Sequence, residues 1–114
     1  MVLTNVLKKN KDFQHVYKKG KSLANKHIVI FVLKNRENTN RLGISASKKV
    51  GGAVVRNKQR RRLKEAYRAL ETWVLPGHDI VILPRVGIVD ISFTEMISNL
   101  RHLLRKHGIW RQHG

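Results

Sequence analysis

Apolar residues recur along the chain with two different spacings, which predicts a domain that mixes helices and strands. In residues 10–19, Phe13 and Tyr17 lie four positions apart, the spacing of one helix face. Asn10 is suited to the N-cap of this helix and Gly20 to the position just after its C-terminus. We therefore expect a short first helix that buries one side.

Three later segments have the composition of strands. Residues 27–34 (HIVIFVLK) are β-branched or aromatic and apolar on both faces, which predicts an interior strand. The turn-forming residues 35–40 (NRENTN) separate it from residues 41–47 (RLGISAS), which we expect to be its antiparallel partner. Residues 78–83 (HDIVIL) form another short apolar strand, and a further short strand around Leu23 is compatible with the pattern.

Two more helices complete the prediction. Residues 53–73 repeat apolar residues every three or four positions until a Pro-Gly pair ends the pattern. Ser92 and Glu95 form a capping box that begins a last helix with its own apolar stripe. The resulting order indicates the α+β class, with helices packed on a small, mostly antiparallel sheet. We expect one domain over residues 1–114, since no repeat or linker interrupts the chain.

The charge of the chain points to a class of partner. Its 114 residues contain 24 Lys and Arg against 7 Asp and Glu, a formal net charge of +17. Hydrophobic residues make up 41%, so this charge decorates a folding domain. A soluble surface needs a net charge of only about 2–8, and a membrane-lytic helix does not fit the strand pattern. Nucleic acid is therefore the expected polyanion.

Other features of the sequence exclude several kinds of site and indicate where in the cell the protein works. The chain contains no cysteine, which excludes a disulfide framework, a thiolate zinc site and a cysteine nucleophile. Apolar runs reach about six residues, far below the roughly 20 that span a bilayer. The N-terminal residues lack the apolar region of a secretory signal, so we expect a cytoplasmic protein.

Positive charge is most concentrated in the long helix, where six of the nine residues 56–64 are Lys or Arg. On a helical wheel most of them share an arc of about 140° beside the apolar stripe. A merely solvated face usually mixes both signs of charge, and like charges at i, i+4 are unfavourable. We therefore expect this helix and the loop before it to bind RNA through Lys48, Lys49, Arg56, Asn57, Lys58, Arg60, Arg61, Arg62, Lys64 and Arg68.

The segment 50–65 (VGGAVVRNKQRRRLKE) closely resembles the signature of the bacterial ribonuclease P protein subunit. Two positions depart from that pattern. Lys58 replaces the second Arg of the family's Arg-Asn-Arg motif and keeps only its charge. Gln59 replaces an aliphatic residue on the apolar side, where we expect looser packing. Residues 7–20 and the later strand and helix are also similar, so the resemblance covers nearly the whole chain. The matching residues are Val50, Ala53, Arg56, Asn57, Arg60, Arg61, Leu63 and Lys64.

This resemblance implies a fold, a role and partners. The fold would be an α/β sandwich with a left-handed βαβ crossover. The role would be that of the protein subunit of a ribonucleoprotein that removes 5′ leaders from precursor tRNA. Ribonuclease P RNA would be the catalytic subunit and, with the substrate, would hold Mg²⁺; neither a membrane nor DNA is expected as a partner. The resemblance places Phe13, Tyr17 and Phe31 in a cleft for the single-stranded leader, whereas periodicity alone favours core positions for them.

The carboxylates and histidines of the sequence form no catalytic grouping. The seven acids are scattered, whereas two-metal hydrolysis needs carboxylates that hold metals about 4 Å apart. The six histidines are also scattered, although a pair brought together by folding would allow acid–base cleavage of RNA. We predict no catalytic residue and no metal ligand. Two alternatives remain: a ribosomal or general RNA-binding protein, and a nuclease that acts without an RNA subunit.

Overall fold

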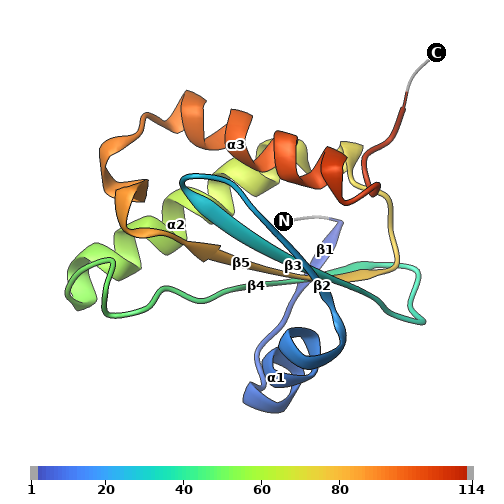
Figure 1. Ribbon diagram of the computed structural model, residues 1–114. Coiled ribbons are helices and arrows are strands. Elements are labelled where there is room, and N and C mark those ends of the chain that lie inside the picture. Colours follow the sequence, from blue (N-terminus) through green and yellow to red (C-terminus); the bar gives the residue numbers. More distant parts are fainter. Residues whose placement is uncertain (1–2, 113–114) are drawn as a thin grey trace.

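The computed structural model describes residues 3–112, which fold into one sheet and three α-helices (Figure 1). Short 3-10 helices at Glu71–Trp73 and Val86–Asp90 flank the last strand. In chain order, the main elements are β1 (Thr4–Val6), α1 (Asn10–Lys19), β2 (Lys21–Ala24), β3 (Ile28–Lys34), β4 (Asn40–Ile44), α2 (Ala53–Leu70), β5 (His78–Pro84) and α3 (Phe93–Lys106).

The sheet has the strand order β1-β4-β5-β3-β2. The prediction that β3 and β4 pair as a hairpin is wrong, because β5 lies between them and pairs antiparallel to β3 and parallel to β4. The physical reason is burial: β5 is apolar on both faces, so it occupies the centre of the sheet. The antiparallel ladders span four and seven positions and the parallel ladders three and four, so the sheet is mixed with an antiparallel majority.

The connection from β4 through α2 to β5 is a βαβ crossover between adjacent parallel strands. Its left hand stays a prediction from the family resemblance. The crossover carries α2 onto one face of the sheet, where α3 packs beside it. Figure 1 shows α1 on the opposite face, below the sheet in this view.

Each face of the sheet has its own core. Alternate residues of β3 and β5, such as Ile30 and Ile82, join the helices α2 and α3 in the larger core. The residues between them, such as Phe31 and Val81, face α1 and form a smaller core with Val16. This smaller core covers β3 and β5, since α1 contacts these strands and leaves the β4 side of that face less covered. The candidate functional site lies on this less covered side.

Several element ends differ from the sequence prediction. The strand β1 was not predicted, because three residues are too few to show a period. The helix α1 begins at Asn10, but Lys9 is its N-cap and no side chain caps it. Gly20 follows α1 in an extended conformation and is needed for a close approach, since a Cβ there would lie 2.5 Å from the Val16 carbonyl oxygen.

Two elements, β4 and α2, end earlier than the sequence predicts. The strand β4 ends at Ile44 rather than at residue 47, and residues 45–47 lead into the turn before α2. The α-helical part of α2 ends at Leu70 and continues as a 3-10 helix to Trp73. The capping box of α3 is confirmed: the Glu95 backbone N–H donates to Ser92 Oγ at 3.1 Å.

Among residues 3–112, no helix has both the length and the apolar character needed to cross a membrane.

Candidate nucleic-acid interface

The N-terminal half of α2 presents a basic surface. Its first turn contains no acidic side chain, and Gly52 provides no side-chain cap. Cations at a helix N-terminus oppose the macrodipole, so helix stability does not explain them. The opposite side of the helix is held in the larger core by Gln59, Leu63, Ala66, Tyr67 and Leu70. This anchoring fixes which side chains face outward.

The predicted RNA-binding residues differ in their exposure. Arg56, Arg60 and Arg62 are half-buried, and the Nε of Arg56 is a buried donor without a hydrogen-bond partner among the described residues. The Arg60 guanidinium donates to Asn57 Oδ1 at 2.6 Å, which fixes its direction. The exposed members are Lys48, Lys49, Asn57, Lys58, Arg61, Lys64 and Arg68.

Arg62 is turned toward the protein itself. Its Nη1 donates to Gln59 Oε1 at 2.9 Å, and its Nη2 donates to the Ile91 carbonyl oxygen at 2.7 Å. These bonds tie α2 to the segment before α3. They also pair the side chain of Gln59, which is only 3% exposed, so this polar residue is accommodated on the buried side. We therefore assign Arg62 a structural role and leave it out of the proposed RNA surface.

Two adjoining hollows form a groove between α1 and α2, which we call the α1–α2 groove. They have volumes of about 220 and 310 Å³ and share Phe13, Ile44 and Arg60. The groove lies where β1 has ended and the edge of β4 is open. The other lining residues of the first hollow are Val6, Leu7, Leu42, Gly43, Arg61 and Lys64. Those of the second are Lys8, Asn10, Gln14, Tyr17 and Ser45.

The aromatic residues predicted for a cleft do lie together. Phe13 and Tyr17 have ring centroids 6.3 Å apart, and Tyr17 meets Phe31 edge-on at 5.1 Å. Phe13 lines both hollows and Tyr17 lines one, whereas Phe31 lines neither and supports Tyr17 from β3. All three are half-buried, so the groove has an aromatic wall. The opposing wall is cationic.

Gly43 permits this position of the Phe13 ring. A Cβ on Gly43 would lie 2.5 Å from Phe13 Cζ and 2.6 Å from Cε1. The ring therefore rests directly on the backbone of β4. Any larger residue at this position would push the ring into the groove.

An ion-pair cluster holds α1 against the sheet beside the groove. Arg41 binds Asp79 with both ends of its guanidinium, at 2.8 Å from Nε and 2.6 Å from Nη2. Its Nη1 lies 3.6 Å from Asp12 on α1. Burial alone would raise the pKa of Asp79, but hydrogen bonds from Arg41 and Asn35 and the charge of Arg41 lower it below its ordinary value. The carboxylate is therefore a fixed anchor.

The groove also includes polar residues that the sequence analysis did not assign to a binding site. Asn10 and Gln14 of α1 and Lys8 before it line the second hollow. A signal for the first two was present, because Asn10, Phe13, Gln14 and Tyr17 follow the i, i+3, i+4, i+7 spacing of one helix face. Ser45 and Lys8 lie in irregular segments, where no period marks them.

Within residues 3–112, no group of three or more His, Asp or Glu side chains is placed to hold a metal ion. Asp79 is already committed to Arg41 and Asn35. The carboxylates that the structure describes thus do not fit a Mg²⁺ site.

Comparison with known proteins identifies the family. The family model of ribonuclease P matches residues 1–108. The ribonuclease P protein component of Clostridioides difficile is 47% identical over 107 residues, which cover 93% of this chain and 94% of the relative. The chain belongs to the ribonuclease P protein family.

Solved ribonuclease P proteins share the architecture described above. The ribonuclease P protein of Staphylococcus aureus matches with a TM-score of 0.84 and 36% identity, over 93% of this chain and 97% of that chain. The Thermotoga maritima protein matches with a TM-score of 0.82 and 33% identity, over 90% and 96% of the two chains. These matches confirm the family resemblance and the α+β fold class expected from the sequence.

Proposed function

We propose that this ribonuclease P protein binds the 5′ leader of precursor tRNA in the α1–α2 groove and ribonuclease P RNA through the basic face of α2. The assembly cleaves the leader from the tRNA in the cytoplasm. The observation that carries the proposal is the pairing of an aromatic wall with a cationic wall in one groove.

The leader-binding role rests on the chemistry of unpaired nucleotides. Bases that are not paired stack on aromatic side chains, which contributes about 1–3 kcal/mol per base. Phe13 and Tyr17 offer such surfaces, and Arg60 faces them across both hollows. Asn10 and Gln14 supply polar groups for sugar and base edges. A base-paired acceptor stem offers no free base faces, so the groove favours the single-stranded leader.

The basic face of α2 is suited to the RNA subunit. Arg61, Lys64 and Lys58 are exposed, and no described acidic side chain forms an ion pair with them. Each phosphate neutralised by such a side chain releases counterions and adds to binding.

The chemical step belongs to the RNA subunit in this proposal. The described carboxylates do not fit a Mg²⁺ site. The family resemblance implies that the RNA subunit and the substrate hold the metal. The protein raises the affinity for the precursor over mature tRNA, which favours binding of substrate and release of product.

The test compares affinities of the reconstituted holoenzyme for precursor tRNA and for mature tRNA. Phe13→Ala combined with Tyr17→Ala should reduce precursor affinity about 5- to 100-fold while mature tRNA affinity stays unchanged. Phe93→Ala is the matched control, because Phe93 is 42% exposed on α3 and lines neither hollow. Equal loss for both RNAs would instead support a general RNA-binding protein.

A further inference from the structure

The chain's two tryptophans lie against each other at the other end of α2. The ring centroids of Trp73 and Trp110 are 6.1 Å apart and the rings are nearly parallel, at 16°. Backbone pairing holds them there: Leu75 N–H donates to the Ile109 carbonyl at 2.7 Å, and Arg111 N–H donates to the Trp73 carbonyl at 2.6 Å. Backbone hydrogen bonds therefore fix the position of the two stacked rings.

A tight turn after α3 brings Trp110 to this place. Gly108 has a φ of +75°, a left-handed conformation that favours glycine. Its N–H donates to the Arg105 carbonyl, and Ile109 N–H donates to the Leu104 carbonyl, the two bonds of a Schellman motif. The helix therefore ends sharply, and the chain reverses along residues 73–75.

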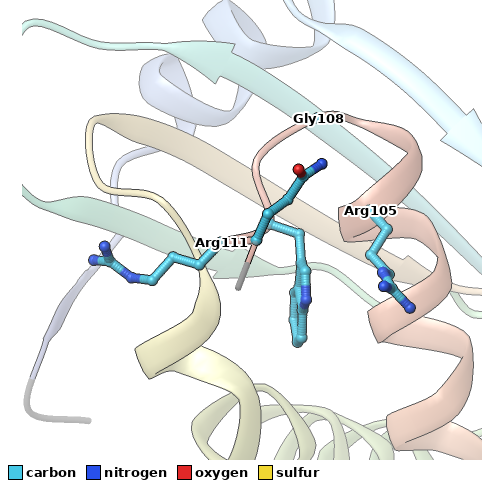
Figure 2. Close-up of a pocket in the computed structure, with 5 residues that line it drawn as sticks. Arg105, Gly108 and Arg111 are labelled. Atoms are coloured by element: carbon cyan, nitrogen blue, oxygen red, sulfur yellow. The ribbon is translucent and has the colours of Figure 1, made fainter. Parts of the chain in front are cut away.

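Trp110 lines two open hollows, and every charged residue that lines them is an arginine. One hollow, of about 300 Å³, is lined by Arg105, Gly108, Trp110, Arg111 and Gln112 (Figure 2). The other, of about 270 Å³, is lined by Ala69, Leu70, Trp73, Arg101 and Trp110. Figure 2 shows Arg105 extending from α3 and Arg111 from the terminal segment, on either side of the hollow. We call this region the tryptophan–arginine surface.

The arginines of this surface have no acidic partner in the described part of the chain. Arg101, Arg105 and Arg111 are exposed and form no ion pair there, and only Arg111 donates a side-chain hydrogen bond, from Nε to the Thr72 carbonyl at 2.9 Å. The Trp110 indole is half-buried, so part of it remains open. Three like charges around an aromatic stack are unfavourable without an anion.

We propose that the tryptophan–arginine surface is a second binding site for single-stranded RNA. A base stacks on the open part of the Trp110 indole, and Arg101 and Arg105 bind the flanking phosphates. Stacking of a base on an aromatic side chain is worth about 5- to 150-fold in affinity, and the arginines supply the charge complementarity. The ligand is therefore an unpaired RNA segment.

This site is independent of the α1–α2 groove. The two share no lining residue, and the basic turns of α2 lie at its N-terminal half while Trp73 follows its C-terminal end. An 18-residue helix is about 27 Å long. The proposal therefore does not rest on the leader-binding role and stands if that role fails.

Intrinsic fluorescence tests the site directly, because the chain's only tryptophans are those of the stack. The intact protein is titrated with a seven-nucleotide oligoadenylate RNA and, separately, with an abasic oligonucleotide of the same length and charge. We expect strong quenching by the oligoadenylate and weak quenching by the abasic strand. Equal quenching by both strands, or none, would overturn the proposal.

Charge variants separate this site from the groove. Arg101→Gln combined with Arg105→Gln should weaken the quenching titration and lower its salt slope by about 1.4, for two lost contacts to a single strand. Phe13→Ala combined with Arg60→Ala should leave the half-saturation of quenching unchanged. If the groove variant abolishes quenching and the α3 variant does not, the fluorescence reports RNA bound in the groove and the proposal is wrong.

Discussion

Gly43→Ala tests how the α1–α2 groove is built. The added Cβ would lie 2.5 Å from Phe13 Cζ and 3.2 Å from Leu7 Cδ2, so the Phe13 ring must leave its seat on β4. Overpacking costs about 1–3 kcal/mol. Because the ring is the end of a half-exposed side chain that can turn outward, we expect the lower end, about 1 kcal/mol, or a Tm lower by about 4 °C.

A double-mutant cycle identifies the source of this destabilisation. Gly43 has no left-handed φ, so alanine fits its backbone and by itself gains about 0.5–1 kcal/mol in a strand. In a Phe13→Ala background, Gly43→Ala should therefore be neutral or stabilising, with a coupling of about 1–2 kcal/mol. Urea unfolding followed by circular dichroism measures all four proteins. Equal destabilisation with and without the ring would refute the account of the groove.

Four further outcomes follow from the structure. Arg60→Ala should lower the slope of log affinity against log salt concentration by about one, for one lost phosphate contact, measured from affinities between 50 and 200 mM salt. Arg62→Ala should leave that slope unchanged and destabilise the fold by about 1–2 kcal/mol in urea unfolding, because it removes two internal hydrogen bonds. The folded-state pKa of Asp79 is lowered, so this carboxylate stabilises the fold fully above the unfolded pKa near 4, and the contribution is lost as pH falls through the folded pKa. In Asp79→Asn, the free energy of unfolding should therefore depend less steeply on pH in that range. Burial chiefly lowers the pKa of His107, whose Nε2 contacts the Ile30 carbonyl. Between the folded pKa and 6.5 the unfolded chain therefore binds more protons than the folded one, and the free energy of unfolding should fall as pH drops through this range. His107→Gln should remove this decline.

Much of the fold follows from local patterns. The range of α1 follows from its apolar spacing, although Asn10 is not its N-cap. The capping box of α3 was predictable because it depends on residues within one helical turn. Strand pairing was not, because β5 reaches its place between β3 and β4 only through a crossover that no local pattern encodes. The strand β1 is held by non-local contacts, such as the Thr4 hydroxyl that donates to Glu71 Oε2 at 2.9 Å.

The site shows the same division. The outward basic face of α2 could be read from a helical wheel, since its buried stripe fixes the opposite side. The inward turn of Arg62 could not, because its acceptor is the Ile91 carbonyl, 29 positions away. The stack of Trp73 on Trp110 likewise depends on a turn at Gly108 that brings distant segments together.

Cleavage of one precursor tRNA at low Mg²⁺ tests the central claim most directly. Three reactions are compared: this protein alone, a bacterial ribonuclease P RNA alone, and the two together. The account predicts 5′ leader removal only when both are present, with a lower rate for Phe13→Ala combined with Tyr17→Ala. Cleavage by the protein alone would contradict it, since catalysis would then belong to this chain's own side chains.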